Sequence, residues 1–236
     1  MKPELKIYPD KQALSKDFAK ELKMLINSKD KVTIALSGGS TPKIIFDIIA
    51  EEAAEAIKWE NVHFYWVDER CVPPTDSDSN YKMTVDHLLS KVNIPKGNVH
   101  RMVGENTPAE EATRYAKEIE AGVPAVNGVP QFDLVLLGMG DDGHTASVFP
   151  YQINLWDSPN LCEVAAHPES GQNRITITGK VINHAKQIAF LVTGKGKAEK
   201  VRVITKEEAG AEQFPASLVS KENLTWYLDK EAAGEI

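Results

Sequence analysis

Cysteine is scarce in this chain of 236 residues, which contains two. Cys71 and Cys162 lie far apart, and neither belongs to a CxxC or Cys/His spacing that would hold a metal ion. The simplest interpretation is a pair of reduced thiols in a reducing compartment.

Long apolar runs are missing as well. The N-terminal segment MKPELKIYPDKQ lacks the apolar core of a signal peptide, and no stretch approaches the roughly 18 apolar residues that a membrane span needs. We therefore expect a cytoplasmic protein without a membrane partner.

The chain also has no excess of basic charge. It carries 27 Lys and Arg against 34 Asp and Glu, interleaved, for a formal net charge of -7. Nucleic-acid binding through counterion release needs a basic surface, so no nucleic-acid partner is expected. A small anionic substrate remains possible, because a few convergent Arg and Lys side chains can form a local positive pocket.

Several catalytic motifs are absent. The sequence contains no GxSxG, its six histidines show no HExxH or paired-ligand spacing, and Cys71 has no evident histidine partner. These gaps argue against a nucleophile elbow and against a bound metal. General-base activation of water remains as a hydrolytic chemistry.

The hydrophobic share of 42% and the charged share of 26% are typical of a compact globular protein, and residues 1–236 fit a single α/β domain. Strand and helix patterns alternate along the chain. We expect helices over 10–27, from 42 onward, near 79–91, near 108–121 and after 197; strands over 31–39, 62–70, 132–140 and 187–193; and a C-terminal strand followed by a helical tail. The stretch 150–175 reads as a loop with an edge element.

The apolar strand patterns are continuous rather than alternating, which favours a mostly parallel sheet covered on both faces. In such sheets ligands bind beyond the carboxyl ends of the strands. The segments that follow the strands are therefore the candidates for a functional site.

The segment ALSGGSTPK runs from a strand into a helix. Its Ser37, Gly38, Gly39, Ser40 and Thr41 would stand at a helix N-terminus, where free backbone N–H groups favour an anion. This predicts a phosphate-binding turn, although neither the Walker pattern nor GxGxxG is present. The alternative is a tight turn with a Ser or Thr N-cap.

The segment VDERCVPP places Asp68, Glu69 and Arg70 after the next apolar run, at the same edge of the sheet. Charged residues at strand ends are often simply solvated. The alternative is that Arg70 faces an anion while Asp68 orients a neighbouring group.

The segment LLGMGDDGHTASVFP ends an apolar run in a glycine-rich turn that delivers His144. Histidine suits proton transfer near neutral pH, and its acid partner would be Asp142 or Asp68. A structural histidine is the alternative, but the glycines and the strand-end position favour a functional one.

Two basic residues follow later strand patterns, Arg174 in RITIT and Lys197 in TGKGKA. Isolated basic residues are usually solvated. Beside a phosphate-binding turn they would be its charge partners.

These segments, in this order, resemble the 6-phosphogluconolactonase family of the glucosamine/galactosamine-6-phosphate isomerase superfamily: SGGSTP, DER.VP…DSN, LGMG.DGHTAS.FP, R.T.T and TG..KA. The resemblance implies hydrolysis of 6-phospho-D-glucono-1,5-lactone to 6-phosphogluconate in the oxidative pentose phosphate pathway, without a cofactor. It also implies a modified Rossmann-like three-layer α/β sandwich similar to glucosamine-6-phosphate deaminase.

The resemblance further implies roles for single residues. His144 matches the proposed general base of the family, and Asp142 matches the acid beside it. Asp68 is a further catalytic candidate. The SGGST turn, Arg70, Arg174 and Lys197 match the substrate and phosphate contacts. Tyr151 and Val148 depart from the usual glycine and leucine, at the periphery of the motif.

Two rival functions have distinguishing features. A sugar-phosphate deaminase/isomerase of the same fold would carry DEY and GHIAFNEP where this chain has DER and GHTASVFP. A sugar-phosphate sensor would need an output module, for which the chain has no room. We therefore expect a lactonase that binds a small sugar-phosphate lactone, as a monomer or weak homodimer.

Overall fold

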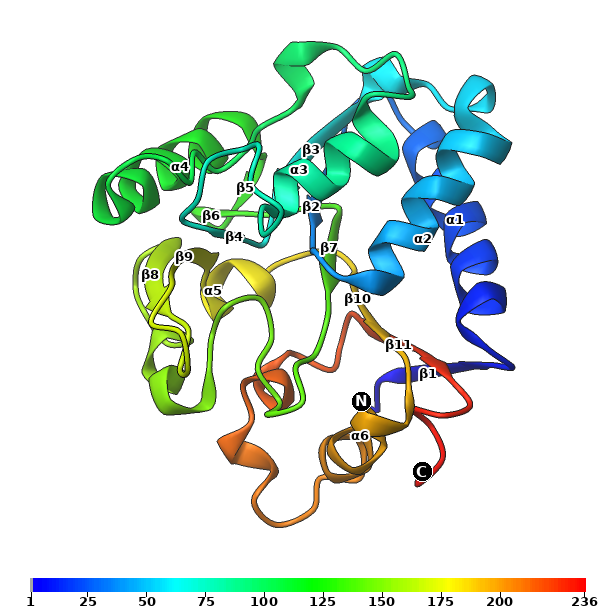
Figure 1. The fold of residues 1–236 in the computed structure, drawn as a ribbon, viewed down its shortest axis with the longest axis vertical. Helices are drawn as coiled ribbons and strands as arrows, with labels where there is room; N and C mark the ends of the chain where they lie inside the picture. The colour runs from blue at the N-terminus through cyan, green and yellow to red at the C-terminus, as the bar shows by residue number, and fades with distance from the viewer. Residues whose placement is uncertain (1) are drawn as a thin grey trace.

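The computed structural model describes residues 2–236. Its largest sheet has six strands in the order β1-β11-β10-β7-β2-β3, and every neighbouring pair is parallel. Figure 1 shows these strands running through the middle of the molecule. The strands are β1 (Glu4–Tyr8), β2 (Val32–Leu36), β3 (Val62–Trp66), β7 (Leu134–Leu137), β10 (Ile188–Val192) and β11 (Leu224–Asp229).

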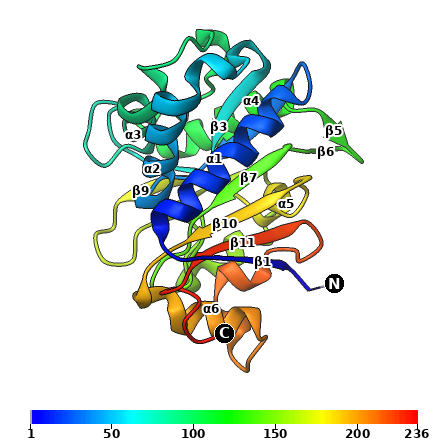
Figure 2. The same cartoon turned by 90° about the vertical axis from the view of Figure 1, so that its right-hand side faces the viewer.

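Helices cover both faces of this sheet, because successive strand residues point to opposite sides. Ile34 packs in the hydrophobic cluster under α1 (Lys11–Asn27) and α2 (Ser40–Ile48), whereas its neighbour Ala35 belongs to the cluster under the helices of the other face. Those helices are α4 (Pro108–Gly122), α5 (Gly179–Ile182) and α6 (Ala198–Thr205). Figure 2 shows α1 lying across the near face of the parallel strands. The result is a three-layer arrangement.

Two small antiparallel sheets complete the fold. The strands β4 (Asp68–Arg70), β9 (Asn173–Ile177) and β8 (Cys162–Ala166) form one, and β5 (Ala125–Val126) and β6 (Val129–Pro130) form the other. Residue Val67 joins the first of them to the main sheet, since its N–H donates to Leu36 O and its carbonyl accepts from Ile177 N, both at 2.9 Å.

Most of the predicted elements are confirmed, and several differ; the helix expected from 42 onward is α-helical only to Ile48. The strand expected over 62–70 divides at Val67 into β3 and β4, which lie in different sheets. The stretch 150–175 holds β8 and part of β9 rather than one edge element, and the expected helical tail after β11 consists of turns. The helix near 79–91 is α-helical at Asn80–Thr84 (α3) and π-helical from Val85 to Leu89. The strand β1 was not predicted.

The order of the strands creates a crevice. From β2 the chain continues to β3 on one side of the sheet, and from β7 it continues to β10 on the other side. The neighbours β2 and β7 therefore form a topological switch point, where the connections leave in opposite directions and open a crevice at the carboxyl ends of the strands.

Candidate active site

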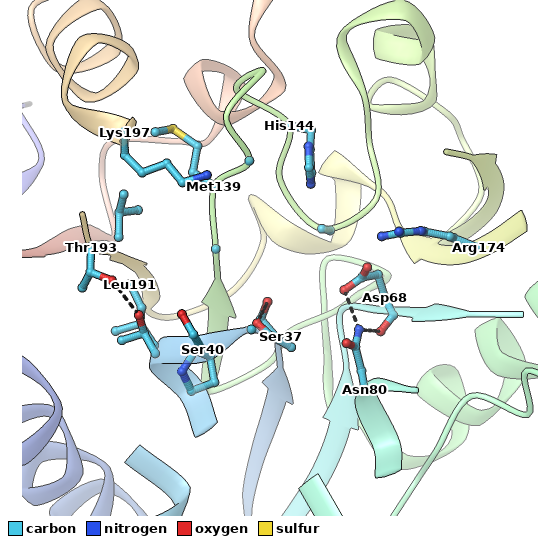
Figure 3. Close-up of a pocket in the computed structure, with 18 of the residues that line it drawn as sticks. Ser37, Ser40, Asp68, Asn80, Met139, His144, Arg174, Leu191, Thr193 and Lys197 are labelled. Atoms are coloured by element: carbon cyan, nitrogen blue, oxygen red, sulfur yellow. Dashed lines mark hydrogen bonds between the residues drawn. The ribbon is translucent and has the colours of Figure 1, made fainter. Parts of the chain in front are cut away.

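A cavity of about 270 Å³ lies at this switch point, over the carboxyl ends of β2, β7 and β10. Figure 3 shows side chains from these strands, from α2 and α3 and from the β4-β9-β8 sheet converging on it. All of the predicted site residues but Asp142 line this cavity, and Asp142 contacts one of them, His144. Those that line the cavity are Ser37, Gly38, Gly39, Ser40, Thr41, Asp68, Arg70, His144, Arg174 and Lys197.

The turn after β2 has the form of an anion-binding turn. Gly39 is the N-cap of α2, with φ at 113°, and no side chain caps the helix. Ser40 and Thr41 open the helix and line the cavity, and the first N–H groups of a helix have no intrahelical acceptor, so they are available to an anion. The alternative of a Ser or Thr N-cap does not occur here. The Lys11 ammonium donates to Ser40 Oγ at 2.7 Å and adds a positive charge beside the turn.

His144 and Asp142 form a hydrogen-bonded pair. His144 Nδ1 lies 2.6 Å from Asp142 Oδ1, which also accepts the His144 backbone N–H at 3.1 Å. An ionised carboxylate can only accept, so Nδ1 carries a proton, and in the neutral imidazole Nε2 is left with a free lone pair. In Figure 3 the imidazole points into the cavity. Of the two acid partners that the sequence left open, Asp142 is therefore the one in contact.

The local backbone makes this pairing possible. Gly143 has φ at 81°, and a Cβ on Gly140 would lie 2.1 Å from His144 Nδ1. The turn can close this tightly because both positions lack a side chain. Burial would raise the pKa of the Asp142 carboxyl, but the hydrogen bond and charge of His144 outweigh it, and the net effect lowers that pKa. Asp142 is thus held as an anion behind the imidazole.

Asp68 occupies a different wall of the cavity. Its side chain is buried, and it accepts hydrogen bonds from Ser147 Oγ at 2.6 Å and from Asn80 Nδ2 at 3.3 Å. Asn80 also donates to the Asp68 backbone carbonyl at 3.0 Å. The sequence reasoning missed Asn80 and Ser147, although both belong to the segments that carry the family resemblance, DSN and HTAS.

Two arginines stand side by side at this end of the cavity. Arg70 and Arg174 are paired across β4 and β9, and the Nε groups of both are buried without a hydrogen-bond partner in the described part of the chain. Burial and the neighbouring charge of Arg70 lower the pKa of the Arg174 guanidinium. Buried guanidinium donors without a hydrogen-bond partner favour an anionic ligand.

Lys197 lines the opposite end of the cavity (Figure 3) and forms an ion pair with Asp141, an exposed residue outside the cavity. The hydroxyl groups of Thr193 and Thr41 lie 3.1 Å apart at the same end. The cavity therefore has cationic groups at both ends and the imidazole between them.

Neither a metal centre nor a membrane segment is evident within residues 2–236. No group of three or more His, Cys, Asp or Glu side chains there is placed to hold a metal ion. No helix in the same range is long and apolar enough to cross a bilayer.

A parallel α/β sheet with an anion-binding turn and an Asp–His pair at its switch point defines a class of proteins that act on small anionic ligands. The sequence places the chain within that class: it belongs to the family of glucosamine-6-phosphate isomerases/6-phosphogluconolactonase, whose sequence model matches residues 10–226. The family resemblance predicted from the motifs is thereby confirmed.

Individual relatives span nearly the whole chain. The 6-phosphogluconolactonase of Haemophilus influenzae is 45% identical over 228 residues, covering 95% of this chain and 96% of the relative. A solved structure described as the devB protein is 46% identical, with a TM-score of 0.94 and 99% of both chains covered. The 6-phosphogluconolactonase of Trypanosoma cruzi is 30% identical, with a TM-score of 0.86, covering 100% of this chain and 97% of that one.

The expected likeness to glucosamine-6-phosphate deaminase is confirmed for the fold. The structure of a monomeric glucosamine-6-phosphate deaminase matches with a TM-score of 0.82 at 21% identity, covering 99% of this chain and 100% of that one.

Proposed function

We propose that this protein hydrolyses 6-phospho-D-glucono-1,5-lactone to 6-phosphogluconate in the oxidative pentose phosphate pathway. The observation that carries the proposal is the His144 imidazole, whose free Nε2 faces a cavity with an anion-binding turn while Asp142 holds its Nδ1. The relatives named 6-phosphogluconolactonase, at 45% and 40% identity over most of the chain, support it.

The proposed chemistry is general-base hydrolysis. His144 Nε2 takes a proton from a water molecule as the water oxygen attacks the lactone carbonyl carbon, and the carbonyl electrons move to its oxygen. The tetrahedral intermediate collapses by breaking the bond to the ring oxygen, which receives the proton back from the imidazolium. Asp142 stabilises that transient positive charge. A positioned base of this kind contributes about 10² to 10⁴ in rate.

The rest of the cavity serves binding. The N–H groups that open α2 and the cations Lys197, Arg70 and Arg174 attract the phosphate dianion and the charge that develops at the carbonyl oxygen. The buried Asp68 carboxylate, fixed by Ser147 and Asn80, accepts a hydrogen bond from a substrate hydroxyl. No step in this scheme requires a cofactor.

The direct test is the disappearance of phosphogluconolactone, measured against its spontaneous hydrolysis. A rate with enzyme no faster than the uncatalysed rate would overturn the proposal. Glucosamine 6-phosphate serves as the comparison substrate, because the rival deaminase activity would release ammonia from it. This chain has DER and GHTASVFP where the rival carries DEY and GHIAFNEP. We therefore expect no release of ammonia.

Location and assembly remain predictions. The two cysteines are free, and burial raises the pKa of the Cys71 thiol to about 11, so this thiol stays protonated and unreactive at neutral pH. Free cysteines agree with the expected cytoplasmic location, because thiols stay reduced there. The expected monomer or weak homodimer can be checked by sedimentation over a range of concentrations.

Chelators are expected to leave the activity unchanged, because the proposed reaction uses imidazole rather than a metal-bound hydroxide. The measurement is the lactonase rate before and after treatment with EDTA, together with the metal content of the active protein. Stoichiometric zinc, lost together with the activity, would contradict the mechanism.

Replacing Arg174 or Lys197 by Ala is expected to raise KM more than it changes kcat. Each change removes a charge-assisted hydrogen bond to the substrate, worth about 1.5–3 kcal/mol, which corresponds to a roughly ten- to hundred-fold rise in KM. The matched control is Lys195→Ala, which removes the same charge from an exposed side chain outside the cavity. An unchanged KM in both variants would mean that neither Arg174 nor Lys197 contributes to substrate binding.

A further inference from the structure

Asn80 lies between the anion-binding turn and Asp68. It is 4% exposed and lines the cavity. Its Nδ2 group donates to the Asp68 carbonyl at 3.0 Å and to Asp68 Oδ1 at 3.3 Å, as Figure 3 shows. On its other side it abuts Gly38, where a Cβ would lie 2.0 Å from Asn80 Oδ1 and 2.6 Å from Asn80 Cγ. The Asn80 side-chain amide thus contacts both the anion-binding turn and Asp68.

A second buried residue fixes Asn80 in place. The Glu69 carboxylate, 2% exposed, accepts the backbone N–H of Asn80 and of Tyr81, both at 2.8 Å, and the hydroxyl of Ser79 at 2.9 Å. The Arg70 N–H donates to the same carboxylate at 2.8 Å. Because four donors converge on one buried carboxyl group, the start of α3 is held rigidly against β4. Glu69, predicted only as part of a charged triplet, is thus the anchor of this segment.

Asp68 depends on Asn80 for its orientation. Within the described residues its carboxylate has two side-chain donors, Ser147 on Oδ2 and Asn80 on Oδ1. With both in place, the carboxylate cannot rotate without breaking a buried hydrogen bond, which costs free energy. If the Asn80 amide is lost, the carboxylate is held at one oxygen only.

We propose that Asn80 is a positioning residue, which sets the separation between the Gly38 backbone of the anion-binding turn and the Asp68 carboxylate. The proposal rests on the proposed function, because this separation fixes where the lactone ring lies when the phosphate is bound. A misplacement of about 1 Å in such a geometry can cost about 10²-fold in rate.

Asn80→Ala is expected to lower kcat/KM about ten- to hundred-fold. The Kd of inorganic phosphate should change less than about two-fold, since phosphate alone contacts the turn and the cations and does not need the ring position. The control is Asn98→Ala, a half-buried asparagine outside the cavity, whose amide donates to Glu60 O. The thermal midpoints of both variants are measured to verify that they fold.

Asn80→Asp separates positioning from space filling. Aspartate keeps the shape and the oxygen beside Gly38, but it places an oxygen where Nδ2 faced the Asp68 carboxylate. Two carboxylates at this distance repel each other unless they share a proton. We therefore expect kcat/KM to fall at neutral pH at least as far as in Asn80→Ala. The ratio of the variant to the wild type should rise as the pH falls and a shared proton restores the donor.

The contact with Gly38 provides a readout that does not depend on catalysis. In Gly38→Ala the new methyl group overlaps the fixed Asn80 amide, so the turn shifts and the Kd of inorganic phosphate rises. Removing the amide as well opens the space that the methyl group needs. In a double-mutant cycle, the loss of phosphate affinity caused by Gly38→Ala should therefore be smaller in the Asn80→Ala background than in the wild type.

The closing experiment combines phosphate titrations of the four proteins of this cycle with the pH profiles of the wild type and Asn80→Asp. We expect the effects of Gly38→Ala and Asn80→Ala on the phosphate Kd to be non-additive. We also expect the kcat/KM profile of Asn80→Asp to be shifted to lower pH relative to the wild type. Additive phosphate binding, or an Asn80→Asp variant with wild-type kcat/KM at neutral pH, would overturn the positioning role. A wild type without lactonase activity would overturn the proposed function, and the phosphate cycle would still decide whether Asn80 and Gly38 are coupled.

Discussion

Replacing His144 by glutamine is expected to lower kcat by about 10² to 10⁴ while 6-phosphogluconate still binds. Glutamine keeps much of the size and some of the hydrogen bonding of histidine, but it offers no nitrogen that can accept a proton from water. The turn, Lys197 and the arginines remain in place, so the affinity for the product should change little. Binding and chemistry would then separate in a single variant.

The pH profile of the wild type provides an independent check. Imidazolium cannot accept a proton, so kcat should fall on the acid side as the base protonates, with a limiting slope of one in log kcat against pH. Because His144 lowers the pKa of the Asp142 carboxyl, Asp142 stays ionised in the range where an imidazole titrates and should add no second step there.

The matched control is His184→Gln, since His184 lies outside the cavity and bonds to the Val126 carbonyl at 2.9 Å. Three quantities are measured on both variants: kcat, the affinity for 6-phosphogluconate and the thermal midpoint Tm. If His144 had only a structural role, His144→Gln would have both a lower Tm and a weaker affinity for 6-phosphogluconate. A folded His144→Gln enzyme with nearly wild-type kcat would mean that another group is the base.

The sequence was informative wherever local pattern determines structure. The strands β2, β7 and β10 are fully buried, so their sequences are continuous apolar runs that can be recognised without knowing their neighbours. Parallel strands separated by helices end at one edge of the sheet, which is why the segments after them could be predicted to form one site. The grouping of these residues around the cavity follows from that rule.

Long-range pairing explains most of what the sequence did not reveal. Strand β4 turns out of the main sheet at Val67 because it pairs with β9, about a hundred residues further along the chain. Strand β1 pairs with β11 from the opposite end of the chain, and its Leu5 and Ile7 are 42% and 51% exposed. Such a half-exposed edge strand carries little of the apolar signal that marks a buried one.

For a similar reason, the sequence could not decide which carboxylate pairs with His144. Asp142 and Asp68 both follow strands, so the sequence allows either to lie beside the imidazole. The choice depends on how tightly the turn closes, which the positive φ of Gly143 and the close approach at Gly140 determine. Asn80 was missed because its role depends on contacts with Gly38 and Asp68, which come from two other elements of the fold.

The other large effect is expected for Asp142→Asn, which should lower kcat by about 10² to 10⁴. The carboxylate can only accept a hydrogen bond, and it therefore keeps the proton on His144 Nδ1 and the lone pair on Nε2. An asparagine amide can donate to Nδ1, which moves the proton to Nε2 and removes the base. It also cannot stabilise the imidazolium that forms when water gives up its proton.

The comparison that isolates this effect is Asp157→Asn, which removes the same charge from an exposed residue outside the cavity and should leave kcat and KM unchanged. The ¹⁵N chemical shifts of the His144 ring report the tautomer directly. The wild type should show the proton on Nδ1, and Asp142→Asn should show it wholly or partly on Nε2. If kcat falls while the tautomer stays on Nδ1, Asp142 acts through the charge of its carboxylate. If neither changes, the pair is structural and the proposed mechanism is wrong.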